Sequence, residues 1–191
     1  TMKILITGGT GMVGSAFKDI DTKHSLVLIG SSEQDLTDYQ SAFSAIKEHN
    51  PDAIIHLAAR VGGVKGNSDY VADFYSDNIR INTNVLLAAH SLGVGKVLSL
   101  LSTCIYPDNA IYPLTEGQIH NGAPHQSNFG YAYAKRMLEV QSRAYRQQYG
   151  SNFITAVPNN LFGKNDNFDL ENGHVIPAII RKVYEAKQSG S

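Results

Sequence analysis

A tyrosine and a lysine four residues apart, Tyr131 and Lys135, lie in a segment whose composition predicts a helix over 131–149. Residues at this spacing share one helix face. A nearby ammonium favours phenolate and lowers the pKa of the phenol from its ordinary value of ~10. A phenol tuned in this way can protonate a ketone oxygen during reduction to an alcohol. The alternative is an amphipathic helix with a buried tyrosine and a lysine that extends its charge to water.

A serine and a cysteine follow the apolar run 96–101, which reads as a strand ending near Ser102. Ligands of open α/β sheets bind beyond the carboxyl ends of strands, so Ser102 could hydrogen-bond the carbonyl that Tyr131 protonates. Cys104, two residues on, points to the same side if the chain stays extended. By itself, a free cysteine is more often a small buried apolar residue.

A glycine-rich turn separates the first predicted strand, 3–7, from a helix. Gly9, Gly11 and Gly14 match G-x-G-x-x-G, and Gly8 with the last two matches the looser G-x-x-G-x-x-G. Such a turn lets backbone amides approach a pyrophosphate at the positive helix end. A tight turn without a ligand is the alternative, but the strand before it and the helix after it favour dinucleotide binding.

The end of the second predicted strand, 26–29, bears on which nicotinamide dinucleotide binds. NAD sites usually place an acid there, bonded to the ribose 2′-hydroxyl. Here Ser31 and Ser32 come before the first acid, Glu33. Serine hydroxyls can donate to a 2′-phosphate, which favours NADP(H). The positive ring of the oxidised cofactor would lower the pKa of Tyr131 further.

Strand-like and helix-like stretches alternate along the chain. This order predicts a Rossmann-type α/β fold, a doubly wound parallel sheet with helices on both faces. The segment 107–129 is predicted to be a long loop, and loops of that length are usually functional. Apolar runs predict strands at 3–7, 26–29, 53–58, 96–101 and 153–157, and helical spacing predicts further helices at 39–50, 74–93 and 176–186.

Composition excludes several classes of protein. Of 191 residues, 42% are hydrophobic and 17% charged, which fits one globular domain and excludes intrinsic disorder. With 16 basic and 17 acidic residues, no charge surplus favours nucleic acid. One cysteine and scattered histidines predict no disulfide and no metal. Without a membrane-length apolar run or a signal-peptide profile, the chain is predicted to be cytoplasmic.

Taken together, three motifs resemble the extended short-chain dehydrogenase/reductases. They are Thr7-Gly8-Gly9-x-Gly11-x-x-Gly14, then His56-Leu57-Ala58-Ala59, then Tyr131-x-x-x-Lys135. Further stretches are similar to the branch of that family that uses NADPH to epimerise C3 and C5 and reduce C4 of GDP-4-keto-6-deoxy-mannose, giving GDP-L-fucose. Those stretches are 102–107, 158–163, 166–168 and 174–177, within a resemblance that runs from Met2 to about Ser189.

The resemblance implies a role for each chemical residue. The protons on C3 and C5 are acidic because both carbons flank the ketone, and Cys104 and His174 would remove and return them. Which of the two is base and which is acid stays open. Tyr131 would protonate the oxygen at C4, Lys135 would hold Tyr131 and the nicotinamide ribose, and Ser102 would orient the carbonyl. Without the resemblance, His174 reads as a loop histidine that precedes a helix.

The resemblance also implies binding residues for the cofactor NADP(H) and for the GDP-sugar substrate. Lys182 falls at a position that meets the sugar-nucleotide diphosphate. The other implied substrate residues are Ser102, Cys104, Tyr131, Asn160, Leu161, His174 and Val175. The implied cofactor residues are Gly8, Gly9, Thr10, Gly11, Met12, Val13, Gly14, Ser31, Ser32, Asp35, Leu36, Leu57, Ala58, Ala59, Leu100, Leu101, Ser102, Thr103, Tyr131, Lys135, Pro158, Asn159, Asn160, Leu161 and His174.

The chain departs from the family pattern at several points. Thr10 stands where some bacterial members have an arginine that can hold the 2′-phosphate, and Lys164-Asn165 stands where Pro-His is common. Family chains continue into a small C-terminal substrate domain that supplies tryptophan, and this chain has no tryptophan. Residues 1–191 are therefore expected to be an NADP-binding Rossmann domain with the substrate domain largely absent. Whether this length is active stays open.

Two alternative functions remain. One is another nucleotide-sugar epimerase or dehydratase of the extended family, although dehydratases share a Thr-Asp-Glu stretch where this chain has Ser102-Thr103-Cys104. The other is a non-catalytic NADP-binding module, against which the intact Ser102, Tyr131 and Lys135 argue.

Quaternary structure is a further implication of the resemblance. Relatives pair two long helices per subunit in a four-helix bundle, and the matching segments here are 74–90 and 131–148. A homodimer is therefore expected, with Ile81, Leu87, Met137 and Val140 facing outward into the bundle. The alternative is that these side chains face the sheet.

Overall fold

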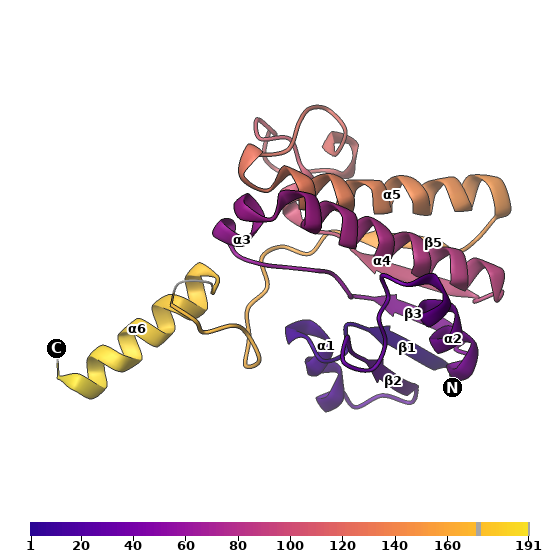
Figure 1. The fold of residues 1–191 in the computed structure, drawn as a ribbon, viewed down its shortest axis with the longest axis horizontal. Coiled ribbons are helices and arrows are strands. Elements are labelled where there is room, and N and C mark those ends of the chain that lie inside the picture. Colours follow the sequence, from indigo (N-terminus) through magenta and orange to yellow (C-terminus); the bar gives the residue numbers. More distant parts are fainter. Residues whose placement is uncertain (171–172, 191) are drawn as a thin grey trace.

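The computed structural model describes residues 1–170 and 173–190, and its centre is a five-stranded parallel sheet (Figure 1). In the strand order β2-β1-β3-β4-β5, the chain builds outward to one side from β1 and to the other side from β3, while all strands stay parallel. At this switch point, a crevice for ligands opens at the carboxyl ends of the strands. The predicted Rossmann-type sheet is confirmed. Its strands are β1 (Lys3–Thr7), β2 (Ser25–Ile29), β3 (Ala53–His56), β4 (Lys96–Leu100) and β5 (Phe153–Ala156).

Long helices cover one face of this sheet, and the short α1 with the turn after it lies against the other. The larger core joins the sheet to α2, α4 and α5, while the smaller core packs Phe17 and its neighbours beside α1 against the opposite face. Figure 1 shows α6 projecting away from the sheet at the end of a long connection. The helices are α1 (Met12–Ala16), α2 (Tyr39–His49), α3 (Val64–Asp69), α4 (Val71–Ser91), α5 (Phe129–Tyr149) and α6 (Val175–Ser189).

The predicted boundaries differ from the observed ones mainly at the site-facing ends. Three strands end one or two residues before the predicted limits, although Leu57 and Leu101 still donate backbone hydrogen bonds to Thr7 and Ala156. Helix α3 lies in a stretch for which no element is predicted. After each strand the chain leaves the sheet, and the segments that follow form the walls of a cavity.

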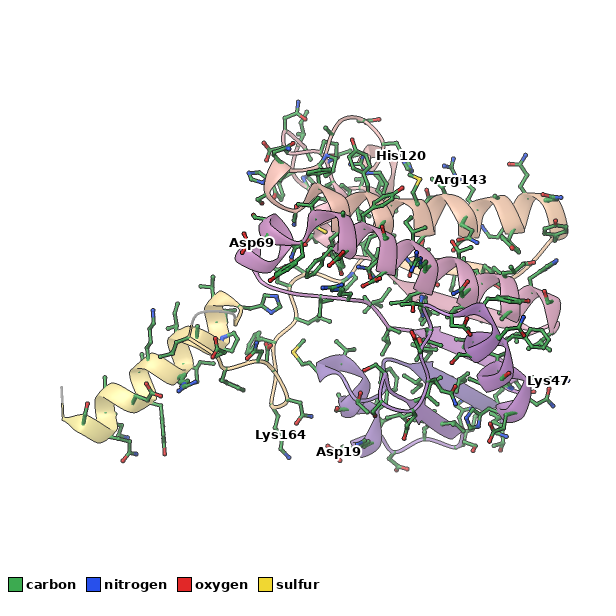
Figure 2. The ribbon with its side chains drawn as sticks, viewed as in Figure 1. Asp19, Lys47, Asp69, His120, Arg143 and Lys164 are labelled. Atoms are coloured by element: carbon green, nitrogen blue, oxygen red, sulfur yellow. The ribbon has the colours of Figure 1, made fainter. Side chains whose placement is uncertain are left out.

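The predicted loop 107–129 is fixed against α5. Short 3-10 turns interrupt it at Glu116–Gln118 and Gln126–Asn128. Arg136 of α5 donates to the carbonyl of Gly122 at 2.8 Å, and His120 lies 2.8 Å from Glu139 of the same helix. Figure 2 shows His120 close to α5. The loop is thereby fixed against the first half of α5.

Candidate active site

A cavity of about 930 Å³ lies at the carboxyl ends of the strands. Its walls come from the glycine turn after β1, the segments after the other four strands, the start of α5 and the start of α6. This volume is near the upper end of the ~300–1,000 Å³ typical of small-molecule sites. All five residues predicted to be catalytic line it: Ser102, Cys104, Tyr131, Lys135 and His174.

Three of the predicted binding residues do not line the cavity. The amide of Gly9 donates to the carbonyl of Ile29 at 2.8 Å, and a Cβ on Gly9 would lie 2.6 Å from the Cβ of Leu28. Gly9 therefore packs the turn against β2. Ser32 is exposed beyond the cavity, and Lys182 is exposed on α6. Ligand contacts for these three residues stay predictions, while the remaining predicted cofactor and substrate residues all line the cavity.

The glycine turn is built so tightly that side chains are excluded from it. Gly8 has φ of 72°, a left-handed conformation, and a Cβ there would lie 2.8 Å from the amide nitrogen of Ala58. A Cβ on Gly14 would lie 2.2 Å from the carbonyl oxygen of Gly8. The bare backbone of Gly8, Gly11 and Gly14 therefore forms one wall of the cavity.

Gly14→Ala is expected to destabilise the fold by about 1–3 kcal/mol, because the added methyl overlaps backbone that cannot move independently. Urea unfolding measures this change. The matched control is Gly117→Ala in the long loop, where a Cβ meets nothing within 4 Å and stability should stay nearly unchanged. Equal unfolding midpoints for the two variants would contradict the tight turn.

Lys135 is buried beneath Tyr131 rather than beside its hydroxyl. Its ammonium donates to the carbonyl of Leu100 at 2.8 Å and lies 5.9 Å from the centroid of the Tyr131 ring. Burial lowers the pKa of Lys135 to about 8, because the charged form loses hydration. A negative charge on Cys104 acts in the opposite direction.

The predicted lowering of the Tyr131 pKa by Lys135 is wrong for the protein without ligand. Burial raises the pKa of Tyr131, and the charge of a nearby Cys104 thiolate raises it further. The physical reason is that the ring is buried while the ammonium is directed to Leu100. Tyr131 therefore holds its proton firmly, and the protonated phenol is the form that a proton donor needs.

Ser102 and Cys104 meet the cavity through a turn. The chain does not stay extended after Ser102, as the spacing argument assumed, because a 3-10 helix spans Thr103–Ile105. The hydroxyl oxygen of Ser102 accepts a hydrogen bond from the amide of Cys104 at 3.4 Å. The pKa of the Cys104 thiol is raised, because burial outweighs two opposing effects. Those effects are a hydrogen bond between the thiol and the Ser102 side chain and the charge of Lys135. Both side chains nevertheless line the cavity.

His174 closes the site from the far end of the chain. It is the N-cap residue of α6, and its side chain is 61% exposed while also lining the cavity. Its Nδ1 atom lies 3.8 Å from a carboxylate oxygen of Asp166. The connection from β5 that carries both residues also carries Lys164, whose side chain points away from the rest of the chain in Figure 2.

His56 of the His-Leu-Ala-Ala motif has a structural position. Its Nδ1 lies 2.8 Å from the hydroxyl of Thr7 and its Nε2 lies 3.0 Å from the amide oxygen of Asn82. Burial lowers its pKa to about 3, so the ring is neutral. These contacts tie β1, β3 and α4 together behind the cavity.

The structure adds cavity residues that the sequence reasoning missed. Arg60 directly follows the His-Leu-Ala-Ala motif, and that adjacency was the available signal. Its guanidinium lies 2.6 Å from the carboxylate of Asp77 on α4, a contact that spacing along the chain does not reveal. Other such residues are Ile29, Gly30, Gln34, Thr37, Val61, Gly62, Gly63, Asn67, Ile81, Asn128, Phe162, Ile176 and Pro177.

Within 1–170 and 173–190, no group of three or more histidine, cysteine, aspartate or glutamate side chains is arranged to hold a metal ion. Among the same residues, no helix is both long and apolar enough to cross a membrane.

Comparison with known proteins assigns the family. Residues 4–190 match the model of the NAD dependent epimerase/dehydratase family. The chain belongs to this family. The predicted membership in the extended short-chain group, whose nucleotide-sugar enzymes include epimerases and dehydratases, is thereby confirmed.

The names of two individual relatives match the predicted branch of the family. A curated GDP-L-fucose synthase of Dictyostelium discoideum is 46% identical over 97% of this chain and 60% of the relative. A probable GDP-L-fucose synthase of Drosophila melanogaster is 43% identical over 96% of this chain and 59% of the relative. The chain thus spans about three fifths of the length of these curated relatives.

A solved structure agrees in fold. A GDP-L-fucose synthetase from Naegleria fowleri bound to NADP superposes with a TM-score of 0.89 and is 41% identical. That similarity covers 99% of this chain and 63% of the other.

Proposed function

We propose that this chain is the NADP(H)-binding domain of an enzyme that converts GDP-4-keto-6-deoxy-mannose to GDP-L-fucose. The observation that carries the proposal is one cavity that gathers Ser102, Cys104, Tyr131, Lys135 and His174 next to the glycine turn. The named relatives support the substrate, because those at 46% and 43% identity are a GDP-L-fucose synthase and a probable one.

The residues of the cavity fit NADP(H). Bare backbone at the glycine turn leaves room for a pyrophosphate, and Ser31 lines the cavity at the end of β2. Glu33, the first acid after the strand, accepts a hydrogen bond from the amide of Gly30 at 3.1 Å, so its carboxylate is turned back onto the strand end. Asp35 lines the cavity, but its carboxylate already accepts from the amide and the hydroxyl of Thr37 at 2.9 and 2.7 Å. This arrangement favours a 2′-phosphate over a free ribose hydroxyl. When bound, NADPH supplies the hydride for C4.

Ser31→Ala is expected to weaken NADPH binding about tenfold or more, because a hydrogen bond to a charged group is worth about 1.5–3 kcal/mol. Fluorescence titration with NADPH and NADH measures the effect, and NADPH should bind more tightly to the unchanged chain. Ser44→Ala is the matched control and should leave NADPH affinity unchanged, since Ser44 is exposed on α2 and does not line the cavity. Tighter binding of NADH would refute the assignment of Ser31.

Epimerisation needs an acid and a base on opposite faces of the sugar. Removing a proton from C3 or C5 leaves the electron pair delocalised onto the ketone oxygen, where the Ser102 and Tyr131 hydroxyls can donate hydrogen bonds. One of Cys104 and His174 takes the proton. The other gives a proton to the opposite face of the same carbon, which reforms the C–H bond and restores the ketone. A thiol and an imidazole can both perform such transfers near neutral pH.

Reduction then uses the phenol. As the carbonyl carbon C4 gains a hydride, its oxygen gains negative charge, and Tyr131 donates its proton there. The raised pKa of Tyr131 keeps the phenol protonated until that charge develops. Lys135, held at the carbonyl of Leu100 with its ammonium 5.9 Å from the ring centroid, keeps Tyr131 and the nicotinamide ribose in place.

The test of this function is product formation from GDP-4-keto-6-deoxy-mannose and NADPH, followed by mass spectrometry. It is run on the chain itself and on the chain joined to the C-terminal part of the Dictyostelium relative. GDP-L-fucose from either form supports the proposal. NADPH binding without product in both forms would instead support the non-catalytic binding module.

A homodimer is part of the same proposal. Helices α4 and α5 pack side by side on one face of the sheet (Figure 1), and Leu87 and Met137 expose 37% and 36% of their surfaces. Ile81, which was expected to face outward, is instead buried in the core beside the cavity, because α4 turns that side toward the sheet. A bundle would therefore use Leu87 and Met137 together with Val140, which is half-buried. A cytoplasmic location suits the free thiol of Cys104.

A further inference from the structure

A buried carboxylate lies behind His174 and is not used by the chemistry described above. Asp166 is on the connection between β5 and α6, and its side chain is only 5% exposed. Its Oδ1 atom accepts a hydrogen bond from the amide of Asn167 at 2.7 Å and lies 3.8 Å from Nδ1 of His174. Its Oδ2 atom is buried without a hydrogen-bond partner among the described residues.

The position of this carboxylate is energetically unfavourable unless it has a partner. Burying a charge with unused lone pairs costs free energy, and such groups are normally paired. The imidazole of His174 faces it, with Nδ1 3.8 Å from Oδ1, and an approach of about 0.6–1 Å would bring the two atoms to hydrogen-bond length. A carboxylate that accepts from one ring nitrogen of histidine fixes which nitrogen faces the substrate.

We propose that Asp166 is a positioning residue for the epimerisation, an inference that rests on the proposed function. Asp166 accepts a hydrogen bond from Nδ1–H of His174, and Nε2 is left to exchange a proton with the sugar carbon. When His174 gives a proton, the Nε2–H bond breaks as the C–H bond forms, and the neutral ring keeps its Nδ1 proton. When His174 takes one, these bond changes reverse and Asp166 stabilises the cation.

A second histidine–aspartate pair in the chain provides a comparison. His125 and Asp108 lie 4.0 Å apart in the long loop, with side chains 61% and 69% exposed, and neither lines the cavity. Water can satisfy that carboxylate fully. The histidines of the two pairs are equally exposed, but the Asp166 carboxylate is only 5% exposed and His174 lines the cavity. The same substitution in the two carboxylates therefore separates a general effect of charge from the proposed role.

Asp166→Asn is the decisive variant. Asparagine keeps an oxygen that accepts from the amide of Asn167, so the loop retains its hydrogen bond, but the negative charge facing His174 is lost. The reaction is followed in deuterium oxide as exchange of the C3 and C5 protons of GDP-4-keto-6-deoxy-mannose, with NADP⁺ present, in the fused chain described above. Exchange at saturating substrate is expected to fall about 10- to 100-fold, the usual cost of losing a group that orients a functional histidine. This is less than the ~10²–10⁴-fold that the proton-transfer group itself contributes, because His174 remains.

Three further readouts separate positioning from folding. The KM for the sugar and the affinity for NADPH should stay within about twofold, Asp166→Glu should recover part of the lost exchange, and Asp108→Asn should leave exchange unchanged. If the unsubstituted enzyme is active and Asp166→Asn exchanges protons at the same rate, the role of Asp166 is overturned and the proposed function is not. Loss of exchange together with NADPH affinity would also overturn the role of Asp166, by showing a structural role. Absence of exchange in the unchanged enzyme would overturn the proposed function as well.

Discussion

Replacing Tyr131 by phenylalanine is expected to lower reduction of the C4 ketone by about 10²–10⁴-fold, the usual contribution of a positioned proton donor. The ring keeps its half-buried place on α5, and only the hydroxyl is lost. NADPH affinity should therefore stay within about threefold. Oxidation of NADPH in the presence of the keto sugar measures the first effect, and fluorescence titration measures the second.

Tyr133→Phe is the matched control for this variant. Tyr133 lies on the same helix, stacks its ring 5.2 Å from the guanidinium of Arg136, and does not line the cavity. Its substitution should leave both measurements unchanged. Parallel loss of reduction and of NADPH binding in Tyr131→Phe would contradict the role of Tyr131 as proton donor.

Cys104→Ser is expected to slow exchange of the substrate's C3 and C5 protons by about 10²–10⁴-fold. Serine preserves the size of the side chain and its place in the 3-10 turn, but an alcohol ionises far less readily than a thiol. Deuterium incorporation from solvent, read by nuclear magnetic resonance, measures the change. NADPH affinity provides the internal control, because the loss is confined to proton transfer at carbon. Unchanged exchange would remove Cys104 from the epimerisation.

Much of the fold was predictable because the spacing of apolar residues agrees with the glycine, proline and N-cap residues that begin and end the elements. All five strands and the helices α2, α4, α5 and α6 were predicted within a few residues. The strands are continuous apolar runs, α2 and α4 have apolar residues at helical spacing, and α5 is marked by its composition. Asp38 begins α2 as an N-cap whose carboxylate accepts from the amide of Ser41. The helix α3 was missed because its residues Val64–Asp69 have no helical apolar repeat.

The identity of the site residues was more predictable than their environment. The resemblance supplied Cys104 and His174, which lie about 70 residues apart in sequence and line one cavity, whereas no local pattern links them. The electrostatics of Tyr131 could not be predicted, because the direction of its pKa shift depends on how deeply α5 buries it. The outward position of Ile81 was wrong for a similar reason, since helical spacing gives a face but not its direction.

Contacts between polar side chains of different segments could not be predicted from the sequence. The pairing of Arg60 with Asp77 and the approach of Asp166 to His174 depend on how two connections fold over the cavity. Neither pair has a spacing that marks it as a motif, so only the assembled chain reveals them.

The measurement that most directly tests the gathering of acid, base and reductant in one cavity is a single reaction in deuterium oxide. GDP-4-keto-6-deoxy-mannose and NADPH are incubated with the fused chain, and the product is read by mass spectrometry and nuclear magnetic resonance. We expect GDP-L-fucose that carries deuterium from solvent at C3 and C5 and ordinary hydrogen from NADPH at C4. A reduced sugar without solvent deuterium at C3 and C5 would contradict the assignment of Cys104 and His174 as the epimerising pair.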